Sequence, residues 1–528
     1  MSTQKFLAKH SLIVATTLAL SAIFGFLRES SIAYKFGATA ATDAYLIAMV
    51  IPNLFVGLIK GSVTNTFVTV YSGYLASGRT DEGWRMTNVV LSLLGLVVAG
   101  LTVVLMLGTA GIVHLVAPGY SGQQLALAVE LTRILLPGML FGTLMGVLVG
   151  VNNANHSFLA PSLVGLVANV ITITSIFILG SVWGIYGLAV GSLLGILAQF
   201  VIQVPSAHRY GLRYRFELDF GDPGLRETLR LVAPFVISAA ASQVNLIVDR
   251  TLATGLPAGV VSALYFANKL VFLPQNIFTG AVGMVVFPLL TRAAAQRQWE
   301  DLIEGFRRSV RLLSLVLLPA ALGIYVLRLP LVKLLFEHGA FTPQSTRITV
   351  ETVGYFLGAL YFGAMVSLVV NVYYALKKMA VAVGTGAVAV LLNIGFSLWF
   401  INPLAQRGLA LANSLSALAN LLMLTSGLYI VLPRLGVQER PLAGIGSFLV
   451  RVAVAVAGTS LVVAGYLRLV GPHVSGKSGL AFTVFSAVLL GVLVYGVLVY
   501  VLRIEEVRKG VTWLWRKARA VCGTSALR

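Results

Sequence analysis

The sequence consists largely of long apolar runs separated by short polar segments. Most runs reach about 20 residues, the length that an α-helix needs to cross the hydrocarbon core of a bilayer. The pattern therefore predicts an all-α polytopic membrane protein with about fourteen transmembrane helices, and it argues against a soluble fold. The predicted spans are residues 11–36, 41–75, 87–116, 123–152, 157–180, 183–206, 228–255, 259–291, 306–328, 347–375, 379–401, 407–432, 445–470 and 478–503.

The chain also contains an internal repeat at an offset of about 221 residues. Each copy holds six predicted spans, and an even number makes both copies enter the membrane in the same direction. We therefore predict two six-helix lobes in parallel repeat, enclosing a cleft, followed by two extra helices. The segments that align are 51–55 with 273–277, 142–154 with 363–375, and 187–189 with 408–410.

The repeat and the spans divide the chain into four predicted parts. Residues 1–220 form the N-terminal six-helix lobe, and residues 221–435 form the C-terminal six-helix lobe. Residues 436–505 form the two extra transmembrane helices. Residues 506–528 form a basic cytoplasmic tail.

Basic residues set the predicted orientation. The chain has 38 Lys and Arg against 18 Asp and Glu, a net charge of +20 that would suggest nucleic-acid binding in a soluble protein. If the N-terminus is inside, about 26 of the basic residues lie in inside segments and about 8 outside, as the positive-inside rule requires. We therefore predict a multi-pass membrane protein with both termini cytoplasmic, membrane lipids as surroundings, and no nucleic-acid partner.

Several enzyme classes are disfavoured by what the sequence contains. It has one cysteine and six histidines without metal-ligand spacing, and it has no large outer loop for catalytic acids. Residues 471–478 match the phosphate-loop pattern of nucleotide-binding proteins, but they lie between two apolar runs instead of after a strand. We therefore predict no enzyme activity, no cofactor and no nucleotide.

Ionisable residues inside spans are the main functional candidates, because a charge at the bilayer centre costs about 2.5–3.5 kcal/mol on insertion scales. At the repeat offset, Arg28 and Glu29 align with Asp249 and Arg250, so the first helix of each lobe holds one acid and one base. The two pairs either face each other across the cleft or lock helices together.

Other embedded charges extend this candidate cavity. Lys60 and Lys269 add positive charge that suits a diphosphate, unless they reach to the membrane interface. Asp43 lies near the outer end of its span, where it can line the cavity, gate it or cap a helix. Glu130 and Arg133, at spacing i, i+3, favour an intrahelical ion pair. The predicted cavity residues are Arg28, Glu29, Asp43, Lys60, Asp249, Arg250 and Lys269.

Five prolines fall near the middle of predicted spans. Proline removes a helical hydrogen bond, so we expect helix breaks at these positions that can serve as hinges for alternating access. The positions are Pro52, Pro137, Pro234, Pro274 and Pro288.

Several motifs resemble the MurJ/MviN lipid II flippases over nearly the whole chain. The resemblance implies a fourteen-helix fold of the multidrug/oligosaccharidyl-lipid/polysaccharide exporter (MOP) superfamily, a central cationic cavity, and a groove for the lipid tail at the last two helices. It also implies alternating-access export of lipid II, the undecaprenyl-diphosphate-linked peptidoglycan precursor, for cell-wall biogenesis. The export runs from the inner to the outer leaflet of the bacterial cytoplasmic (inner) membrane. The motifs lie at residues 25–29, 36–38, 42–44, 51–54, 152–161, 335–342 and 408–412.

Departures from the family pattern leave the substrate open. Family members have arginines near Ala22 and near Val56 and Gly57. The alternatives are a flippase for another polyprenyl-linked oligosaccharide and a MATE-like drug/cation antiporter of the same superfamily, which the basic embedded residues favour less.

The resemblance also suggests an ion site. Relatives that bind sodium do so at places that match Asp249, Asn393 and Ser414, and Ser397 stands where a second carboxylate occurs. A serine lowers the charge-driven affinity for a hard cation. Sodium or proton coupling therefore stays open, and no other metal is predicted.

Overall fold

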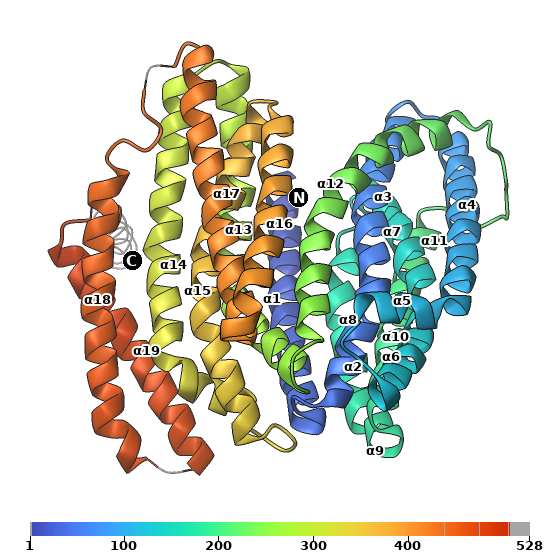
Figure 1. The fold of residues 1–528 in the computed structure, drawn as a ribbon. Helices are drawn as coiled ribbons and strands as arrows, with labels where there is room; N and C mark the ends of the chain where they lie inside the picture. The colour runs from blue at the N-terminus through green and yellow to red at the C-terminus, as the bar shows by residue number, and fades with distance from the viewer. Residues whose placement is uncertain (1–2, 438, 475, 505, 507–528) are drawn as a thin grey trace, which may run out of the picture. The chain divides into compact units, whose positions relative to one another are not determined.

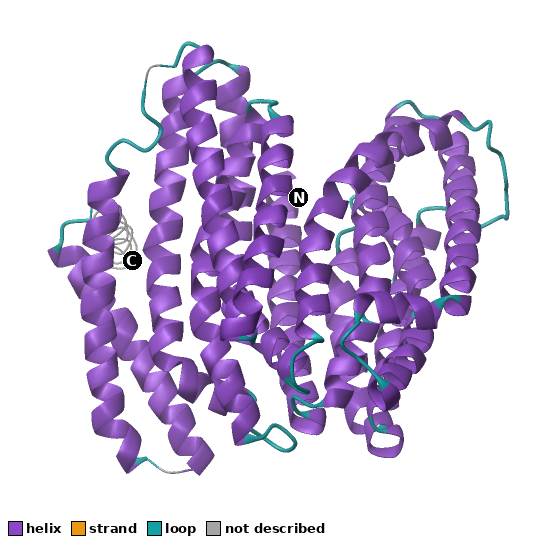
Figure 2. Cartoon of the chain, viewed as in Figure 1, coloured by secondary structure: helices purple, strands orange, loops and turns teal. Residues whose placement is uncertain are grey.

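The computed structural model describes residues 3–437, 439–474, 476–504 and 506. Within these residues all regular secondary structure is helical (Figures 1 and 2). The elements are α1 (Thr3–Phe36), α2 (Ala40–Ala48), α3 (Val50–Ala76), α4 (Thr80–Leu107), α5 (Thr109–Val116), α6 (Gly122–Leu135), α7 (Gly138–Ala154), α8 (Leu159–Phe177), α9 (Leu179–Trp183), α10 (Ile185–Val201), α11 (Gln203–Arg209), α12 (Pro223–Ala253), α13 (Val260–Ala295), α14 (Trp299–Leu335), α15 (Pro343–Ala375), α16 (Met379–Leu404), α17 (Gln406–Arg434), α18 (Ile445–Val470), the 3-10 helix η1 (Gly471–His473) and α19 (Gly476–Val501).

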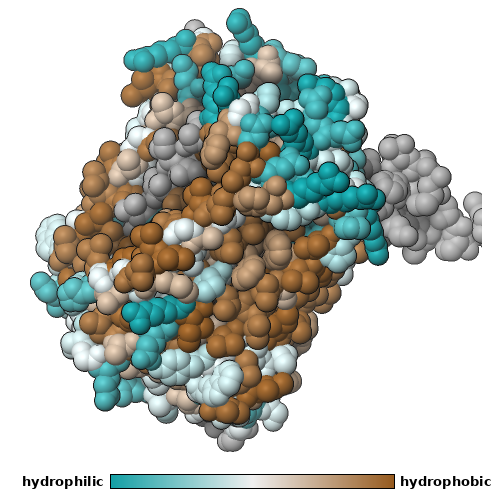
Figure 3. All heavy atoms as spheres, turned by 90° about the vertical axis from the view of Figure 1, so that its right-hand side faces the viewer, coloured by the Kyte–Doolittle hydropathy of each residue, from teal (hydrophilic) through white to brown (hydrophobic). Residues whose placement is uncertain are grey.

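The helices confirm the predicted polytopic membrane fold. Twelve helical stretches in the described residues are long and apolar enough to cross a membrane, and each overlaps one predicted span. The other two predicted spans fall on α1 and α12, which are 34 and 31 residues long and are not among the twelve. Figure 3 shows a broad band of hydrophobic side chains on one face, with hydrophilic side chains gathered above it. Such a band is the surface that a bilayer requires.

The helices group into two compact units. The N-terminal unit comprises Met1–Ala263 and Phe336–Ser345, and the C-terminal unit comprises Leu264–Leu335 and Thr346–Arg528. In the N-terminal unit α1 packs on α8, and α3 packs on both α7 and α12. In the C-terminal unit α16 packs on α17, and α18 packs on α14 and α19. The predicted lobe boundary rests on the internal repeat and not on packing, and it stays a prediction.

Unusual backbone conformations recur at the repeat offset. His156 follows α7 with φ of 58°, and Lys377 follows α15 with φ of 57°. Gly184 precedes α10 with φ and ψ of 56° and −133°, and Ala405 precedes α17 with 50° and −128°. A positive φ is uncommon outside glycine, so two such matches about 221 residues apart are strong signs of a shared backbone design.

Close helix contacts recur in the same way. A Cβ on Gly187 would lie 2.3 Å from the carbonyl carbon of Leu179, and a Cβ on Gly408 would lie 2.3 Å from the carbonyl oxygen of Phe400. Each glycine therefore lets the start of one helix press against the backbone that precedes it.

Buried side-chain hydrogen bonds also recur. Asn152 on α7 donates to the carbonyl oxygen of Gln203 at 3.4 Å. Tyr373 on α15 donates to the carbonyl oxygen of Leu424 at 2.8 Å. Both partners are displaced by about 221 residues, as the predicted repeat requires.

The predicted proline breaks are only partly correct. α6 and α7 are separated at Pro137, and Pro52 lies in the first turn of α3, where a proline removes no helical hydrogen bond. The breaks predicted at three other prolines are wrong, because membrane helices can tolerate proline when neighbouring groups satisfy the freed carbonyls. α12 runs without interruption through Pro234, and α13 runs through Pro274 and Pro288.

Candidate functional site

An ion pair between neighbouring residues lies on α1 in the N-terminal unit. Arg28 Nη2 is 2.6 Å from Glu29 Oε1, and the Glu29 side chain is only 4% exposed. The Arg28 side chain is 29% exposed, so part of the guanidinium can still meet a ligand. A buried carboxylate beside an accessible arginine holds that arginine in one orientation, which suits recognition of phosphate oxygens.

The second predicted charge pair comes to the same place. The Tyr45 hydroxyl on α2 lies within electrostatic range of Arg28, Glu29 and Arg250. Arg250 on α12 donates through Nη1 to the carbonyl oxygen of Leu46 at 2.9 Å. Asp249, next to it, is partly buried. Arg28 and Glu29 of α1 and Arg250 of α12 therefore act electrostatically on one buried tyrosine of α2.

Tyr45 itself was not a candidate from the sequence. Its side chain is 4% exposed, and its hydroxyl shares a hydrogen bond of 2.7 Å with Ser192 Oγ on α10. A tyrosine in an apolar helix gives no sequence signal of such a partner. We call Arg28, Glu29, Tyr45 and Arg250 the charged cluster.

Asp43 serves as a helix cap. It is 1% exposed, and its carboxylate accepts hydrogen bonds from the backbone N–H of Gly259 at 2.6 Å and of Ser262 at 2.7 Å. The Ser262 hydroxyl also donates to it. Gly259 and Ser262 flank the start of α13, whose first N–H groups lack helical partners. Of the roles considered for Asp43, the cap is the one that the contacts show.

The two lysines of the predicted cavity lie on α13 and α3. Lys269 lies on α13 in the C-terminal unit, with Nζ 5.2 Å from the ring centroid of Tyr265, a cation–π distance. The Lys60 side chain lies outside the described residues, although its backbone belongs to α3.

The predicted pair of Glu130 and Arg133 is wrong. Glu130 accepts a hydrogen bond from the hydroxyl of Tyr186 on α10, and among the described ion pairs there is none between Glu130 and Arg133. An exposed i, i+3 pair stabilises a helix by only about 0.2–0.5 kcal/mol, so a hydrogen bond from a neighbouring helix can replace it.

The residues suggested for an ion site are divided between the units. Asn393 and Ser397 are fully buried one turn apart on α16, and Asn393 Oδ1 and Ser397 Oγ have no hydrogen-bond partner in the described structure. Ser414 on α17 uses its hydroxyl in hydrogen bonds of 2.6 and 2.9 Å to the α15 backbone. Asp249 belongs to the N-terminal unit. The oxygens of Asn393 and Ser397 fit the preference of hard cations for oxygen ligands.

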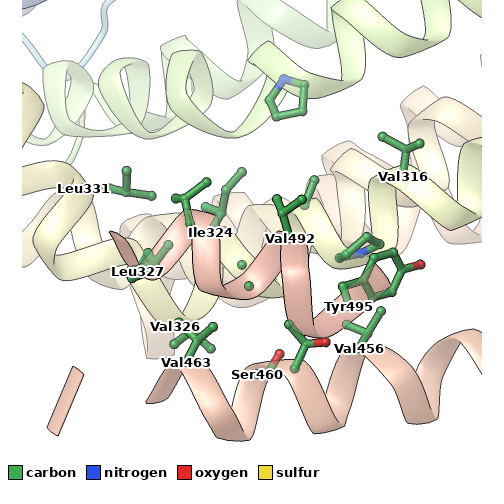
Figure 4. Close-up of a pocket in the computed structure, with 18 of the residues that line it drawn as sticks. Val316, Ile324, Val326, Leu327, Leu331, Val456, Ser460, Val463, Val492 and Tyr495 are labelled. Atoms are coloured by element: carbon green, nitrogen blue, oxygen red, sulfur yellow. The ribbon is translucent and has the colours of Figure 1, made fainter. Parts of the chain in front are cut away.

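An apolar cavity of about 530 Å³ lies in the C-terminal unit between α13, α14, α18 and α19. Leu327 of α14, Val463 of α18 and Val492 of α19 line it (Figure 4). The Tyr495 hydroxyl donates to the carbonyl oxygen of Leu315 at 2.8 Å, so its polar end is satisfied. We call this cavity the apolar groove, and its lining suits a hydrocarbon chain.

Two helical units, a charged cluster on α1, α2 and α12, and an apolar groove are features of a polytopic membrane transporter, and solved structures share this fold. "Lipid II flippase MurJ, inward closed conformation" aligns with a TM-score of 0.78 at 23% identity, covering 94% of this chain and 100% of that chain. An inward-facing multidrug resistance MATE family transporter of the MOP superfamily aligns with a TM-score of 0.66 at 14% identity, covering 79% and 98%.

Sequence comparison identifies the family. The family model "Lipid II flippase MurJ" matches residues 32–493, so the chain belongs to the MurJ family of lipid II flippases. The probable lipid II flippase MurJ of Vibrio cholerae serotype O1 is 28% identical over 81% of this chain and 84% of its own length. The lipid II flippase MurJ of Burkholderia cenocepacia is 26% identical over 87% and 89%. The chain is thus a multi-pass transporter and not an enzyme.

Proposed function

We propose that the protein moves lipid II from the cytoplasmic to the outer leaflet of the cytoplasmic membrane. The observation that carries the proposal is the family match over residues 32–493. The charged cluster and the apolar groove support it, because lipid II joins a diphosphate head to a long hydrocarbon tail. The orientation, with both termini cytoplasmic, follows from the positive-inside distribution of basic residues.

In this proposal the charged cluster meets the head group. Arg28 is the partly exposed cation, and its planar guanidinium can bind two phosphate oxygens at once. Glu29 holds Arg28 in place, and Arg250 contributes a second positive charge near Tyr45. Lys269 supplies a further cation on α13, while the apolar groove accepts the tail during alternating access.

We also propose that transport draws on an ion gradient. The support is the pair of buried oxygens, Asn393 Oδ1 and Ser397 Oγ, on one face of α16. Sodium is the hard cation that such oxygens would hold, and proton coupling is the alternative. Replacing external sodium with choline should slow lipid II export if sodium is the ion, and dissipating the pH gradient should slow it if protons are.

The decisive test is complementation in cells depleted of their own lipid II flippase. The wild-type gene should restore growth and outer-leaflet lipid II, whereas Arg28→Ala and Lys269→Ala should restore less than a tenth of the export. Arg308→Ala removes an exposed arginine on α14 and is the matched control. Full rescue by both cavity variants would refute the assignment of these residues.

A second candidate is the export of another polyprenyl-linked oligosaccharide. The observation that favours it is Gly57, near a position where family members have arginine: a Cβ there would lie 2.9 Å from Gln243 Nε2 on α12. A side chain at Gly57 would therefore first meet the flexible end of the Gln243 side chain, and the cation that family members have nearby is missing at this position. Failure to restore lipid II export, together with rescue of cells that lack a flippase for another undecaprenyl-linked glycan, would select this candidate.

A further inference from the structure

An extended segment between α11 and α12 has two chemically different faces. In an extended chain successive side chains point to opposite sides. The alternation runs without interruption from residue 212 to residue 220. The apolar positions are Leu212, Tyr214, Phe216, Leu218 and Phe220, and the charged positions between them are Arg213, Arg215, Glu217 and Asp219.

Two polar residues of α4 hold this segment in place. Asn88 Nδ2 donates to the carbonyl oxygen of Arg213 at 3.3 Å. Ser92, one turn further along α4, accepts from the backbone N–H of Glu217 at 3.2 Å and shares a hydrogen bond of 3.2 Å with the Tyr214 hydroxyl. The segment is thus a fixed surface of the N-terminal unit.

The apolar side of the segment borders a cavity of about 510 Å³. Leu212, Tyr214 and Phe216 line it together with leucines of α4 and α7 and Phe200 of α10. Tyr214 and Phe216 are 57% and 62% exposed, which is unusual for aromatic side chains in water. Aromatic side chains gather at the level of lipid head groups, where their apolar rings meet hydrocarbon.

The charged side of the same segment borders a second cavity, of about 580 Å³. Arg85 and Asp219 pair across it at 2.9 Å, and Asp81 and Glu217 are also in its lining. Arg213 and Arg215 are exposed and take part in none of the ion pairs of the described residues. From residue 208 to residue 216 the chain has three arginines and no acid.

We propose that these two cavities form one binding site for an anionic glycerophospholipid. Its phosphate lies on Arg213 and Arg215, and an acyl chain fills the apolar cavity behind Tyr214 and Phe216. Because one extended segment borders both cavities, a molecule that joins an anionic head directly to a long hydrocarbon can reach both. The inference rests on embedding in the membrane and does not depend on which lipid-linked substrate is transported.

The proposed phosphate site on Arg213 and Arg215 is tested by lipid binding to the purified full-length chain in detergent. Native mass spectrometry gives the number of bound lipid molecules. The probe is dioleoyl-phosphatidylglycerol, compared with dioleoyl-phosphatidylcholine and with inorganic phosphate. Arg213→Ala with Arg215→Ala should weaken phosphatidylglycerol binding roughly tenfold to thirtyfold, since each basic residue near an anionic surface contributes. The matched control, Arg292→Ala with Arg308→Ala, removes two other exposed arginines and should leave binding unchanged.

The acyl-chain half is tested by filling the apolar cavity. Gly95 of α4 lines this cavity, and the nearest atom to a Cβ there is 3.9 Å away, so the Cβ of Gly95→Leu meets no clash. It should weaken phosphatidylglycerol binding severalfold, whereas Gly100→Leu on the same helix, with nothing within 4 Å, should not.

Three results would overturn the proposal: equal binding of the two phospholipids, equal losses in the arginine variant and its control, or inorganic phosphate binding as tightly as phosphatidylglycerol. Binding is measured without lipid II, so a failed complementation test leaves this result unaffected.

Discussion

The most direct test of the fold concerns Asp43, which joins α2 to the start of α13. An unsatisfied buried donor costs about 1–3 kcal/mol, so Asp43→Ala, which strands the N–H groups of Gly259 and Ser262, should cost about 2–6 kcal/mol. Asp43→Asn keeps one acceptor oxygen but turns an amide N–H₂ toward a donor, so its cost should fall between wild type and Asp43→Ala.

Asp222 provides a matched comparison, because it caps α12 through one hydrogen bond of 2.8 Å to the N–H of Leu225. Loss of such a cap costs about 0.5–2 kcal/mol. Asp301 is exposed in the first turn of α14 and should be nearly neutral when changed to alanine. Unfolding midpoints in one detergent should therefore fall in the order Asp301→Ala, Asp222→Ala, Asp43→Ala. If the unfolding midpoint of Asp43→Ala equals that of Asp222→Ala, the Asp43 carboxylate does not stabilise the protein through three hydrogen bonds.

The repeated joints and contacts give three further predictions, each read as a change in unfolding free energy. Ala405→Gly should stabilise the protein by about 1 kcal/mol by relieving a positive φ, and the reverse change at the equivalent joint, Gly184→Ala, should destabilise it by about 1–2 kcal/mol. Gly408→Ala should cost about 1–3 kcal/mol, because its Cβ would collide with the backbone carbonyl of Phe400. A smaller cost than that of a glycine-to-alanine change at an exposed position would contradict this close approach. Tyr373→Phe removes one hydrogen bond to the carbonyl of Leu424, which lies inside α17 and keeps its helical donor, so it should cost about 0.5–1.5 kcal/mol. An unchanged midpoint would contradict the hydrogen bond.

The spans and the repeat were predictable because both can be recognised from short stretches of sequence without knowledge of tertiary contacts. Runs of about 20 apolar residues can satisfy their backbone in a membrane only as helices or closed barrels. The repeat required only self-comparison, and the structure extends it to joints such as Gly184 and Ala405, whose side chains no longer match. Family resemblance then identified the transporter class.

The roles of individual charges were less predictable because they depend on contacts between distant residues. The Asp43 carboxylate meets Ser262, which lies 219 positions further along the chain. Tyr186 meets Glu130 from another helix, so a rule based on i, i+3 spacing chose the wrong partner. Proline rules failed along α13 for a related reason: the neighbours that satisfy a freed carbonyl are not visible in the local sequence.

The left-handed joints that recur after α7 and α15, and before α10 and α17, bear on the history of the chain. At each joint the bend has persisted while the residue has changed, from histidine to lysine and from glycine to alanine. This is the pattern expected if one ancestral half was duplicated and the two copies kept these backbone conformations while their side chains changed. Each half could then gain its own functional side chains, such as the arginine and glutamate of α1, while the shared backbone stayed the same.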